Sequence, residues 1–355
     1  MDLYPSLDLK PFPKFSRPEI CGAFSVDSNL RFQHGMEHLK YLSIPKKVDF
    51  DLNNGEDSYV EKPDVDNKIN HLLKFMTDHE DVLRSNQFNF VCFRGLLRMI
   101  MCTPYEYRET WIILATKFKG TIYLCAQETE EKKDEKLRRT DRDKRFMRYG
   151  HKFENYVFAS HPHGEAPGSN KQVVEAEEFC TMFNTKIGGM SVLYGAEIDG
   201  VISKDIVATL PELKKVPLVE VKVKRRESNE RQIQNFYRYK ARNFWCQSFL
   251  VGIDKVFVGL RNDNGIVNEV TSYTLKELSD QAKQKNYWHG TVCMNFLNDF
   301  LHKVMLDMKD IDDPYTVFKY QWDASKCDYV SCQKICDKSF CFLTNEFIQF
   351  MNNLC

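Results

Sequence analysis

The chain has 355 residues, and its formal net charge is zero because 50 basic and 50 acidic side chains balance. Hydrophobic residues make up 43% of it and charged residues 28%, which is typical of a globular protein with a substantial core. This balance excludes a uniformly basic surface, so any positively charged binding surface is expected to be a local groove. Without a long apolar run or an apolar leader, neither a membrane span nor secretion is predicted.

The first half of the chain predicts an extended start, then helices and a hairpin. Prolines in residues 1–20 indicate an extended lead-in, and residues 47–66, rich in Asp, Asn and Gly, indicate a loop. Helices are expected over 67–85 and 94–102. Lys119-Gly120 separates two apolar runs, 112–115 and 121–125, which predicts a hairpin. The mixed-charge run 128–148 is expected to be a solvated helix or loop without chemistry of its own.

The second half mixes strands and helices without regular alternation. Apolar or β-branched runs predict strands over 192–198, 218–223 and 255–260, and Asn264-Gly265 is a strong hairpin signal. Further helices are expected over 171–185, 231–248, 275–284 and 290–308. These patterns predict a mixed α/β (α+β) fold with a central, mostly antiparallel sheet. No clean linker is visible, so residues 1–355 are expected to form a single domain.

The 12 cysteines are interpreted as reduced thiols of a nuclear or cytoplasmic protein, with the nucleus favoured. One dense cluster stands near the C-terminus: Cys327, Cys332, Cys336 and Cys341. Its spacing does not match that of zinc sites, so small buried hydrophobic side chains near a C-terminal helix are the favoured interpretation.

Two short segments carry a pattern suited to chemistry. Residues two apart on a strand face the same side, so Glu197 and Asp199 project together, as do Glu220 and Lys222. Their apolar neighbours face the other way: Ala196, Ile198, Val219 and Val221. Three carboxylates and a lysine therefore stand on strands otherwise suited to burial.

Buried carboxylates are costly unless they are paired or bind a metal. Converging acids repel one another, and a divalent cation with a preference for oxygen ligands, Mg²⁺ or Mn²⁺, relieves the repulsion. Asp199 and Glu220 are 21 positions apart, and this gap followed by Glu-x-Lys resembles the active-site pattern of PD-(D/E)xK nucleases. Alone this pattern is weak, and surface salt bridges on a hairpin are the competing interpretation.

Further polar residues have two interpretations each. Glu154 ends the segment Tyr149 to Glu154, where it is either a further acid of the site or an ordinary helix or strand residue. Arg94 lies in an apolar stretch and needs an anionic partner, either a structural carboxylate or a phosphate. Lys224, Arg225 and Arg226 follow the Glu220 strand as candidate basic groups of a pocket or as a solvated strand end.

These segments together resemble one family, the DXO-type decapping exonucleases, which includes the fungal partner of the nuclear 5′→3′ exoribonuclease. The segments that carry the resemblance are Phe12 to Arg31, Arg94-Gly95 running on to Thr103-Pro104-Tyr105-Glu106, Gly150 to Glu154, Glu197-Ile-Asp199, Glu220-Val-Lys222, Trp245 to Gly252 and Gly259-Leu-Arg261. The resemblance extends from about residue 10 to about residue 300. It departs at His151, Phe93 and Phe244, where other aromatic residues are commoner, and this bears on substrate preference.

The resemblance implies two packed β-sheets surrounded by helices. It implies one or two Mg²⁺ or Mn²⁺ ions held by Glu154, Glu197, Asp199, Glu220 and the Val221 carbonyl. Lys222 and Gln247 would then contact the scissile phosphate or the attacking water. Arg94, Lys224 and Arg261 are the implied substrate-binding residues.

The function so implied is hydrolysis at RNA 5′ ends by a monomer that acts in RNA quality control. The expected activities are decapping, pyrophosphate release from 5′-triphosphate RNA, removal of NAD caps and 5′→3′ degradation. Two alternatives remain. One is a scaffold that binds RNA ends or stabilises a partner exoribonuclease, and the other is a DNA nuclease with the same kind of site.

Overall fold

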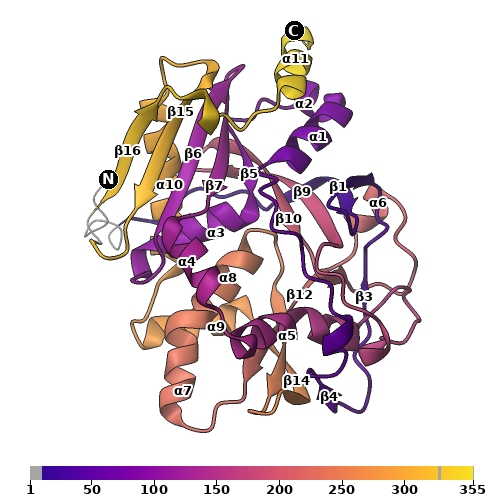
Figure 1. The fold of residues 1–355 in the computed structure, drawn as a ribbon. Helices are drawn as coiled ribbons and strands as arrows, with labels where there is room; N and C mark the ends of the chain where they lie inside the picture. The colour runs from indigo at the N-terminus through magenta and orange to yellow at the C-terminus, as the bar shows by residue number, and fades with distance from the viewer. Residues whose placement is uncertain (1–9, 327–328, 355) are drawn as a thin grey trace.

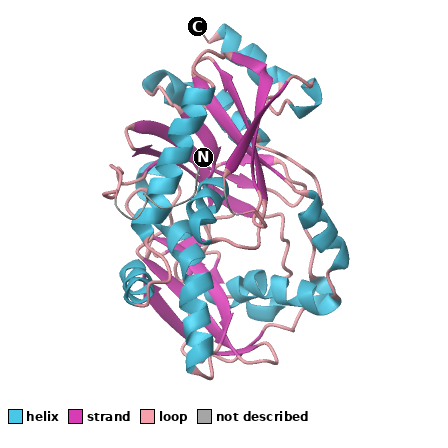
Figure 2. Ribbon diagram, turned by 90° about the vertical axis from the view of Figure 1, so that its left-hand side faces the viewer, coloured by secondary structure: helices cyan, strands magenta, loops and turns pink. Residues whose placement is uncertain are grey.

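The computed structural model describes residues 10–326 and 329–354, and it contains two mixed β-sheets flanked by helices. The two sheets lie in different halves of the molecule, with helices on their outer faces (Figures 1 and 2). The mixed α/β class with two packed sheets is therefore confirmed. No helix in the described residues combines the length and apolar composition that a membrane crossing requires.

The larger sheet has nine strands in the order β16-β15-β6-β7-β5-β10-β9-β1-β2. Their bounds are β1 Glu19–Val26, β2 Phe32–His34, β5 Phe90–Phe93, β6 Trp111–Phe118, β7 Thr121–Gln127, β9 Glu178–Ile187, β10 Met190–Glu197, β15 Asp313–Trp322 and β16 Val330–Ile335. The hairpin predicted around Lys119-Gly120 is confirmed as β6 and β7. β5 pairs in parallel with β7 and β10, and the other neighbours are antiparallel.

The smaller sheet has seven strands in the order β4-β14-β13-β12-β11-β3-β8. Their bounds are β3 Tyr41–Leu42, β4 Phe50–Asp51, β8 Phe158–Ala159, β11 Gly200–Val201, β12 Leu218–Arg225, β13 Lys255–Arg261 and β14 Ile266–Thr274. The turn at Asn264-Gly265 joins β13 and β14 as predicted.

Helices cover both faces of each sheet (Figure 1). Their bounds are α1 Asn70–Asp78, α2 Glu80–Ser85, α3 Arg94–Cys102, α4 Glu130–Arg138, α5 Asp141–Val157, α6 Leu210–Leu213, α7 Glu230–Asn235, α8 Ala241–Phe249, α9 Leu275–Gln284, α10 Gly290–Asp307 and α11 Asn345–Asn353. Side chains of α3, α8 and α10 share one core with the sheet, and those of α1 and α11 share another. The charged run 128–148 forms α4 and the first half of α5.

The chain crosses from one sheet to the other within a few residues. β10 ends at Glu197 in the larger sheet, and β11 begins at Gly200 in the smaller one. β5, which runs parallel to β10, ends at Phe93 opposite Gly195, so Arg94 emerges at the same edge. This junction between the sheets therefore gathers polar residues from distant parts of the sequence.

Helix α5 lies close against β13 because a glycine leaves room for it. A Cβ added at Gly259 would stand 2.7 Å from the ring of Phe153, which is fully buried. Real side chains do not approach so closely, and the contact therefore requires glycine. The next residue of α5, Glu154, is held at the junction as a result.

The predicted helix over 171–185 is wrong, because residues 178–187 form strand β9. Cores cover both faces of this strand: Phe179 and Phe183 pack into one core, while Cys180 and Met182 pack into the other. Apolar residues on both faces remove the alternation that would indicate a strand, and their spacing then mimics a helix.

The expected burial of the C-terminal cysteines is also wrong for the residues that the structure describes. Cys332 and Cys336 are exposed, and Cys341 is partly buried. Cys332 lies on β16, the edge strand of the larger sheet, where most side chains face solvent. Cys327 lies outside the described residues.

The N-terminal lead-in is described from residue 10, and it contains no helix before β1 begins.

We expect Gly259→Ala to lower the free energy of unfolding by about 1–3 kcal/mol, because the added methyl group displaces the Phe153 ring. Urea denaturation measures this change. Gly95→Ala is the matched control, since a Cβ added at this position of helix α3 would have nothing within 4 Å, and it is expected to stabilise the protein slightly. Equal stability of the Gly259 variant and the wild type would contradict the close-packing argument.

Candidate active site

The predicted acids meet at the junction of the two sheets. Gly200 of β11 pairs with Val219 of β12, so Asp199, directly before β11, stands beside Glu220 on β12. The Val221 N–H donates a hydrogen bond of 2.7 Å to Asp199 Oδ2. This bond fixes the aspartate against the strand that carries the glutamate.

Glu220 is fully buried, with an exposed fraction of 0%. Its Oε1 accepts hydrogen bonds from Gln247 Nε2 at 2.5 Å and from the ammonium group of Lys222. Its Oε2 has no hydrogen-bond partner among the described residues, and the guanidinium of Arg94 lies 3.7 Å away. A buried carboxylate oxygen without a hydrogen bond is rare, and it indicates a position where another ligand binds.

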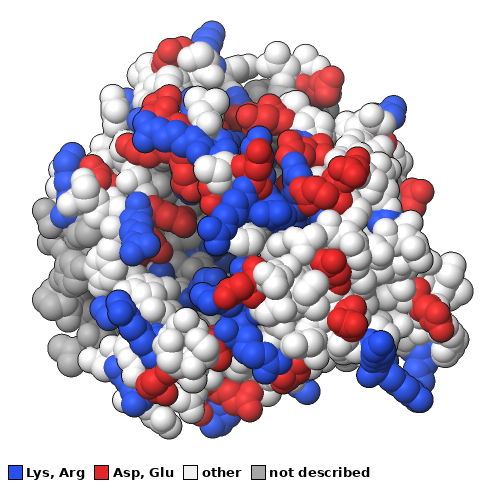
Figure 3. Space-filling view, turned by 60° about the horizontal axis from the view of Figure 1, so that its bottom comes forward, with Lys and Arg blue, Asp and Glu red and all other residues white. Residues whose placement is uncertain are grey.

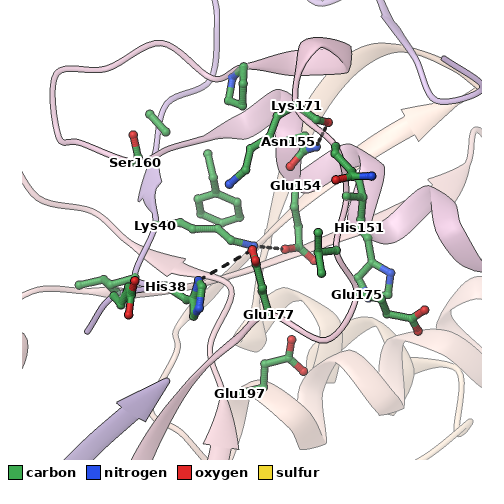
Figure 4. Close-up of a pocket in the computed structure, with 18 of the residues that line it drawn as sticks. His38, Lys40, His151, Glu154, Asn155, Ser160, Lys171, Glu175, Glu177 and Glu197 are labelled. Atoms are coloured by element: carbon green, nitrogen blue, oxygen red, sulfur yellow. Dashed lines mark hydrogen bonds and ion pairs between the residues drawn. The ribbon is translucent and has the colours of Figure 1, made fainter. Parts of the chain in front are cut away.

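Glu154 reaches the same place from helix α5. Lys40, which precedes β3, donates a 2.8 Å hydrogen bond to its Oε2. Figure 4 shows these two side chains pointing toward one another across a hollow, with Glu197 below them. Lys40 is a site residue that the sequence did not reveal, because no motif surrounds it and its partner is 114 positions away.

The shared cleft changes the acidity of these carboxyl groups. Burial, together with Glu178 and Glu154, raises the pKa of Glu197 from 4.5 to about 7. Glu197 is itself exposed, at the place where the two hollows of the site meet, so the repulsion by its neighbours acts together with partial burial. Burial and the adjacent Glu220 raise the pKa of Asp199 well above its ordinary value. The positive charges near these carboxylates are therefore too few to balance them.

The two lysines respond in the opposite sense. Burial alone would lower the pKa of Lys222, but the carboxylates of Glu220 and Asp199 outweigh it and raise the pKa. The pKa of Lys40 is raised in the same way, since Glu154, Asp199 and Glu197 outweigh its burial. Both ammonium groups thus act as counter-ions of the carboxylates.

Arg94 is buried, and its guanidinium is committed to the protein. It donates hydrogen bonds to the backbone carbonyl oxygens of Glu197 at 3.0 Å and Gln247 at 3.3 Å, and it faces Glu220. Of its two interpretations, this geometry favours the structural one. Arg94 ties β10, β12 and α8 together at the site.

The predicted basic residues line the cleft, but most have protein partners. Lys224 is buried with Glu227 and lies 3.9 Å from the centre of the Phe236 ring. Arg225 pairs with Asp263 at 2.6 Å. Arg261 stacks 4.8 Å from the centre of the Phe146 ring. Arg226 pairs with Glu269 on the surface and does not line the cleft.

These residues surround a cleft of about 510 Å³. It contains all four carboxylates, with Lys222 and Gln247. A second hollow of about 330 Å³ meets it at His151, Glu154 and Glu197. Seen from the end of the molecule where α7, β14 and β4 lie in Figure 1, lysine and arginine side chains gather around a hollowed surface (Figure 3). Acidic side chains lie among these cations around the hollow (Figure 3).

In the part of the chain that the structure describes, no three carboxylate, imidazole or thiolate groups lie close enough to hold one ion. Glu154 is turned to Lys40, and Asp199 to the Val221 N–H. The donor set nevertheless suits a hard divalent cation, since it offers several carboxylate oxygens and one of them lacks a hydrogen bond. An ion there would compete with Lys40 for Glu154 and with the Val221 N–H for Asp199.

Comparison with known proteins gives one consistent result. Residues 16–348 match the family model described as RAI1-like PD-(D/E)XK nuclease. The chain belongs to this family. It is 30% identical to the decapping and exoribonuclease protein of Mus musculus over 98% of this chain and 88% of that protein. It is 32% identical to the Rai1 decapping and exoribonuclease protein of Drosophila melanogaster, over 86% of this chain and 84% of that protein.

Solved structures of the family share the fold. The crystal structure of Candida albicans Rai1 in complex with pU5 and Mn²⁺ superposes with a TM-score of 0.84 at 20% identity, covering 97% of this chain and 96% of that one. Kluyveromyces lactis Dxo1 in complex with manganese superposes with a TM-score of 0.61 at 14% identity, covering 92% and 91%. The resemblance to the DXO-type family noted from the motifs is thus confirmed along nearly the whole chain.

The raised pKa of Glu197 makes stability depend on pH in metal-free buffer. The folded protein holds this proton more tightly than the unfolded chain, so the free energy of unfolding should fall as the pH rises from about 4.5 to about 7. We expect Glu197→Gln to flatten this slope and to be more stable than the wild type at pH 7. Urea denaturation in EDTA across this range measures it, and an unchanged slope would contradict the electrostatic account.

Proposed function

We propose that this protein is a metal-dependent hydrolase that acts at the 5′ ends of RNA. The observation that carries the proposal is the fully buried Glu220, which has one oxygen without a hydrogen bond and lines a cleft with three further carboxylates. Its relatives are named decapping and exoribonuclease proteins, and structures with its fold hold pU5 with Mn²⁺ or (3′-NADP)⁺ with calcium. These ligands support a nucleotide substrate and a divalent cation for this chain.

The ligands we propose for Mg²⁺ or Mn²⁺ are Glu154, Glu197, Asp199, Glu220 and the Val221 carbonyl. A bound divalent ion lowers the pKa of water and neutralises charge on a phosphoryl group. Lys222 lies beside Glu220 and can hold a phosphate oxygen or the attacking water once the carboxylate turns to the metal. Gln247 orients the same carboxylate, and Arg94 fixes the backbone on which both stand.

We predict that Glu220→Gln and Asp199→Asn each lower turnover by about 100-fold or more, because each removes a charge that holds the ion. RNAs labelled at the 5′ end, with monophosphate, triphosphate, unmethylated cap, methylated cap or NAD cap, are incubated in Mg²⁺, Mn²⁺ or EDTA. Label should be released only with metal, and the released species identifies the reaction. Circular dichroism checks that each variant is folded, and Glu130→Gln on the exposed helix α4 is the charge-matched control.

Full activity of either variant would contradict the metal site. No release from any RNA by the wild type would favour the scaffold, in which the chain binds RNA ends or stabilises a partner exoribonuclease. The presence of all four carboxylates supports the enzyme over the scaffold. Matched single-stranded DNA in the same assay tests the third alternative, a DNA nuclease.

Lys40 occupies the position of a counter-ion, and its removal should favour the metal. We predict that Lys40→Met tightens Mn²⁺ binding by about tenfold, equivalent to about 1.4 kcal/mol, because the ion no longer displaces an ammonium group from Glu154. Calorimetric titration measures the affinity. Lys136→Met, which removes an exposed lysine paired with Glu128, is the control. Weaker Mn²⁺ binding in Lys40→Met would show instead that Lys40 positions Glu154 for the ion.

A further inference from the structure

Two more hollows continue from the catalytic cleft, away from Glu154. The first, of about 750 Å³, shares Lys224, Arg225 and Lys240 with the cleft. The second, of about 470 Å³, shares four residues with the first: Tyr105, Tyr107, Tyr239 and Arg242. The three spaces therefore adjoin one another in a row that leads away from Glu154. We call the two outer hollows the tyrosine groove.

The tyrosine groove contains a positive charge that no acidic side chain of the groove neutralises. Its two glutamates are already engaged, Glu106 by Arg242 at 2.9 Å and Glu227 by Lys224. Lys240 is in no ion pair with any residue that the structure describes, and it stands at the point where the groove joins the cleft. Burial, with Arg261 and Lys224 nearby, lowers the pKa of Lys240. A lysine without an ion pair, at the point where the groove meets the cleft, indicates a place for an anion.

The hollow at the other side of Glu154 has the opposite character. Besides the site carboxylates Glu154 and Glu197, it is lined by four further glutamates, Glu37, Glu165, Glu175 and Glu177, against two lysines, Lys40 and Lys171. A long polyanion would be repelled there, whereas the tyrosine groove would attract it. This asymmetry indicates the direction in which a nucleic-acid strand leaves the carboxylates.

Exposed aromatic rings accompany the positive charge. Tyr107 is 56% exposed and Tyr239 45% exposed, and both line the groove. The guanidinium of Arg238 lies 5.4 Å from the centre of the Tyr239 ring. Rings that stay open to solvent beside basic groups are the arrangement on which bases of a single strand stack.

The backbone that presents Tyr239 and Lys240 is unusual. Residues 236–240 form a π-helical turn between α7 and α8, closed by the Ala241 N–H on the Phe236 carbonyl. Such wide turns are rare and occur often at functional sites, because they break the regular spacing of side chains. Here the turn lies where the groove meets the catalytic cleft, next to the helix that supplies Gln247.

We propose that the tyrosine groove binds the single-stranded RNA that follows the scissile bond on its 3′ side. Lys240 holds a backbone phosphate close to the carboxylates, and Tyr239 and Tyr107 stack on successive bases. The inference rests on the proposed action on RNA, and it adds the direction of the strand and the residues that hold it.

Binding in EDTA tests the groove without any need for catalysis. Two 5′-monophosphate RNAs carry a 3′ fluorophore, one a trinucleotide and one of about 12 nucleotides. For the double variant Tyr239→Ala with Lys240→Ala, anisotropy should show affinity for the longer RNA reduced by about tenfold or more. The loss for the trinucleotide should be smaller. The slope of log affinity against log salt should fall by about 1 in magnitude, because one phosphate contact is removed.

The matched control is Tyr329→Ala with Lys215→Ala, which removes an exposed tyrosine and an exposed lysine from outside the groove. It should bind both RNAs like the wild type. Equal losses for both RNAs, or no loss, would overturn the groove. The proposed hydrolysis fails separately from the groove. It fails if the wild type binds the longer RNA more tightly than the double variant does but releases no label from it.

Discussion

The mutual repulsion of carboxylates in one cleft is the constraint on which the site depends. Glu197 ends β10 in the larger sheet, Glu220 lies on β12 in the smaller sheet, Asp199 stands in the link between β10 and β11, and Glu154 is added from a helix. Without metal, the protein compensates them with Lys40 and Lys222, whose ammonium groups lie against Glu154 and Glu220. The compensation is incomplete, since the pKa of Glu197 stays at about 7 and one oxygen of Glu220 has no hydrogen bond. The same deficit of positive charge that strains the metal-free protein makes the site suitable for a divalent cation.

Three features of the fold hold these carboxylates in place without taking part in the proposed reaction. The short passage from β10 to β11 moves the chain between sheets and leaves Glu197 and Asp199 at the junction. Gly259 lets α5 approach the smaller sheet, and Arg94 binds the carbonyls behind the site. Changes to these supports are therefore expected to affect the site through geometry, even though none of them has to touch a substrate.

Local patterns in the sequence were enough to predict the acids but not their surroundings. The period of two on β12 placed Glu220 and Lys222 on one face, and Asn264-Gly265 indicated the hairpin of β13 and β14. Strand β9 was mistaken for a helix because both of its faces are buried. Lys40 could not be predicted, since its role depends on a partner brought near only by folding. Lys224 was expected to be free for substrate, but Glu227 and two aromatic rings enclose it.

The central claim is that a divalent cation replaces the lysine counter-ions of these carboxylates. Anomalous diffraction from crystals soaked in Mn²⁺ tests it most directly. The account predicts a manganese peak about 2–2.6 Å from oxygens of Asp199, Glu220 and the Val221 carbonyl, with Glu154 turned away from Lys40. Crystals without manganese at these carboxylates, in which Lys40 and Lys222 keep their present partners, would contradict it.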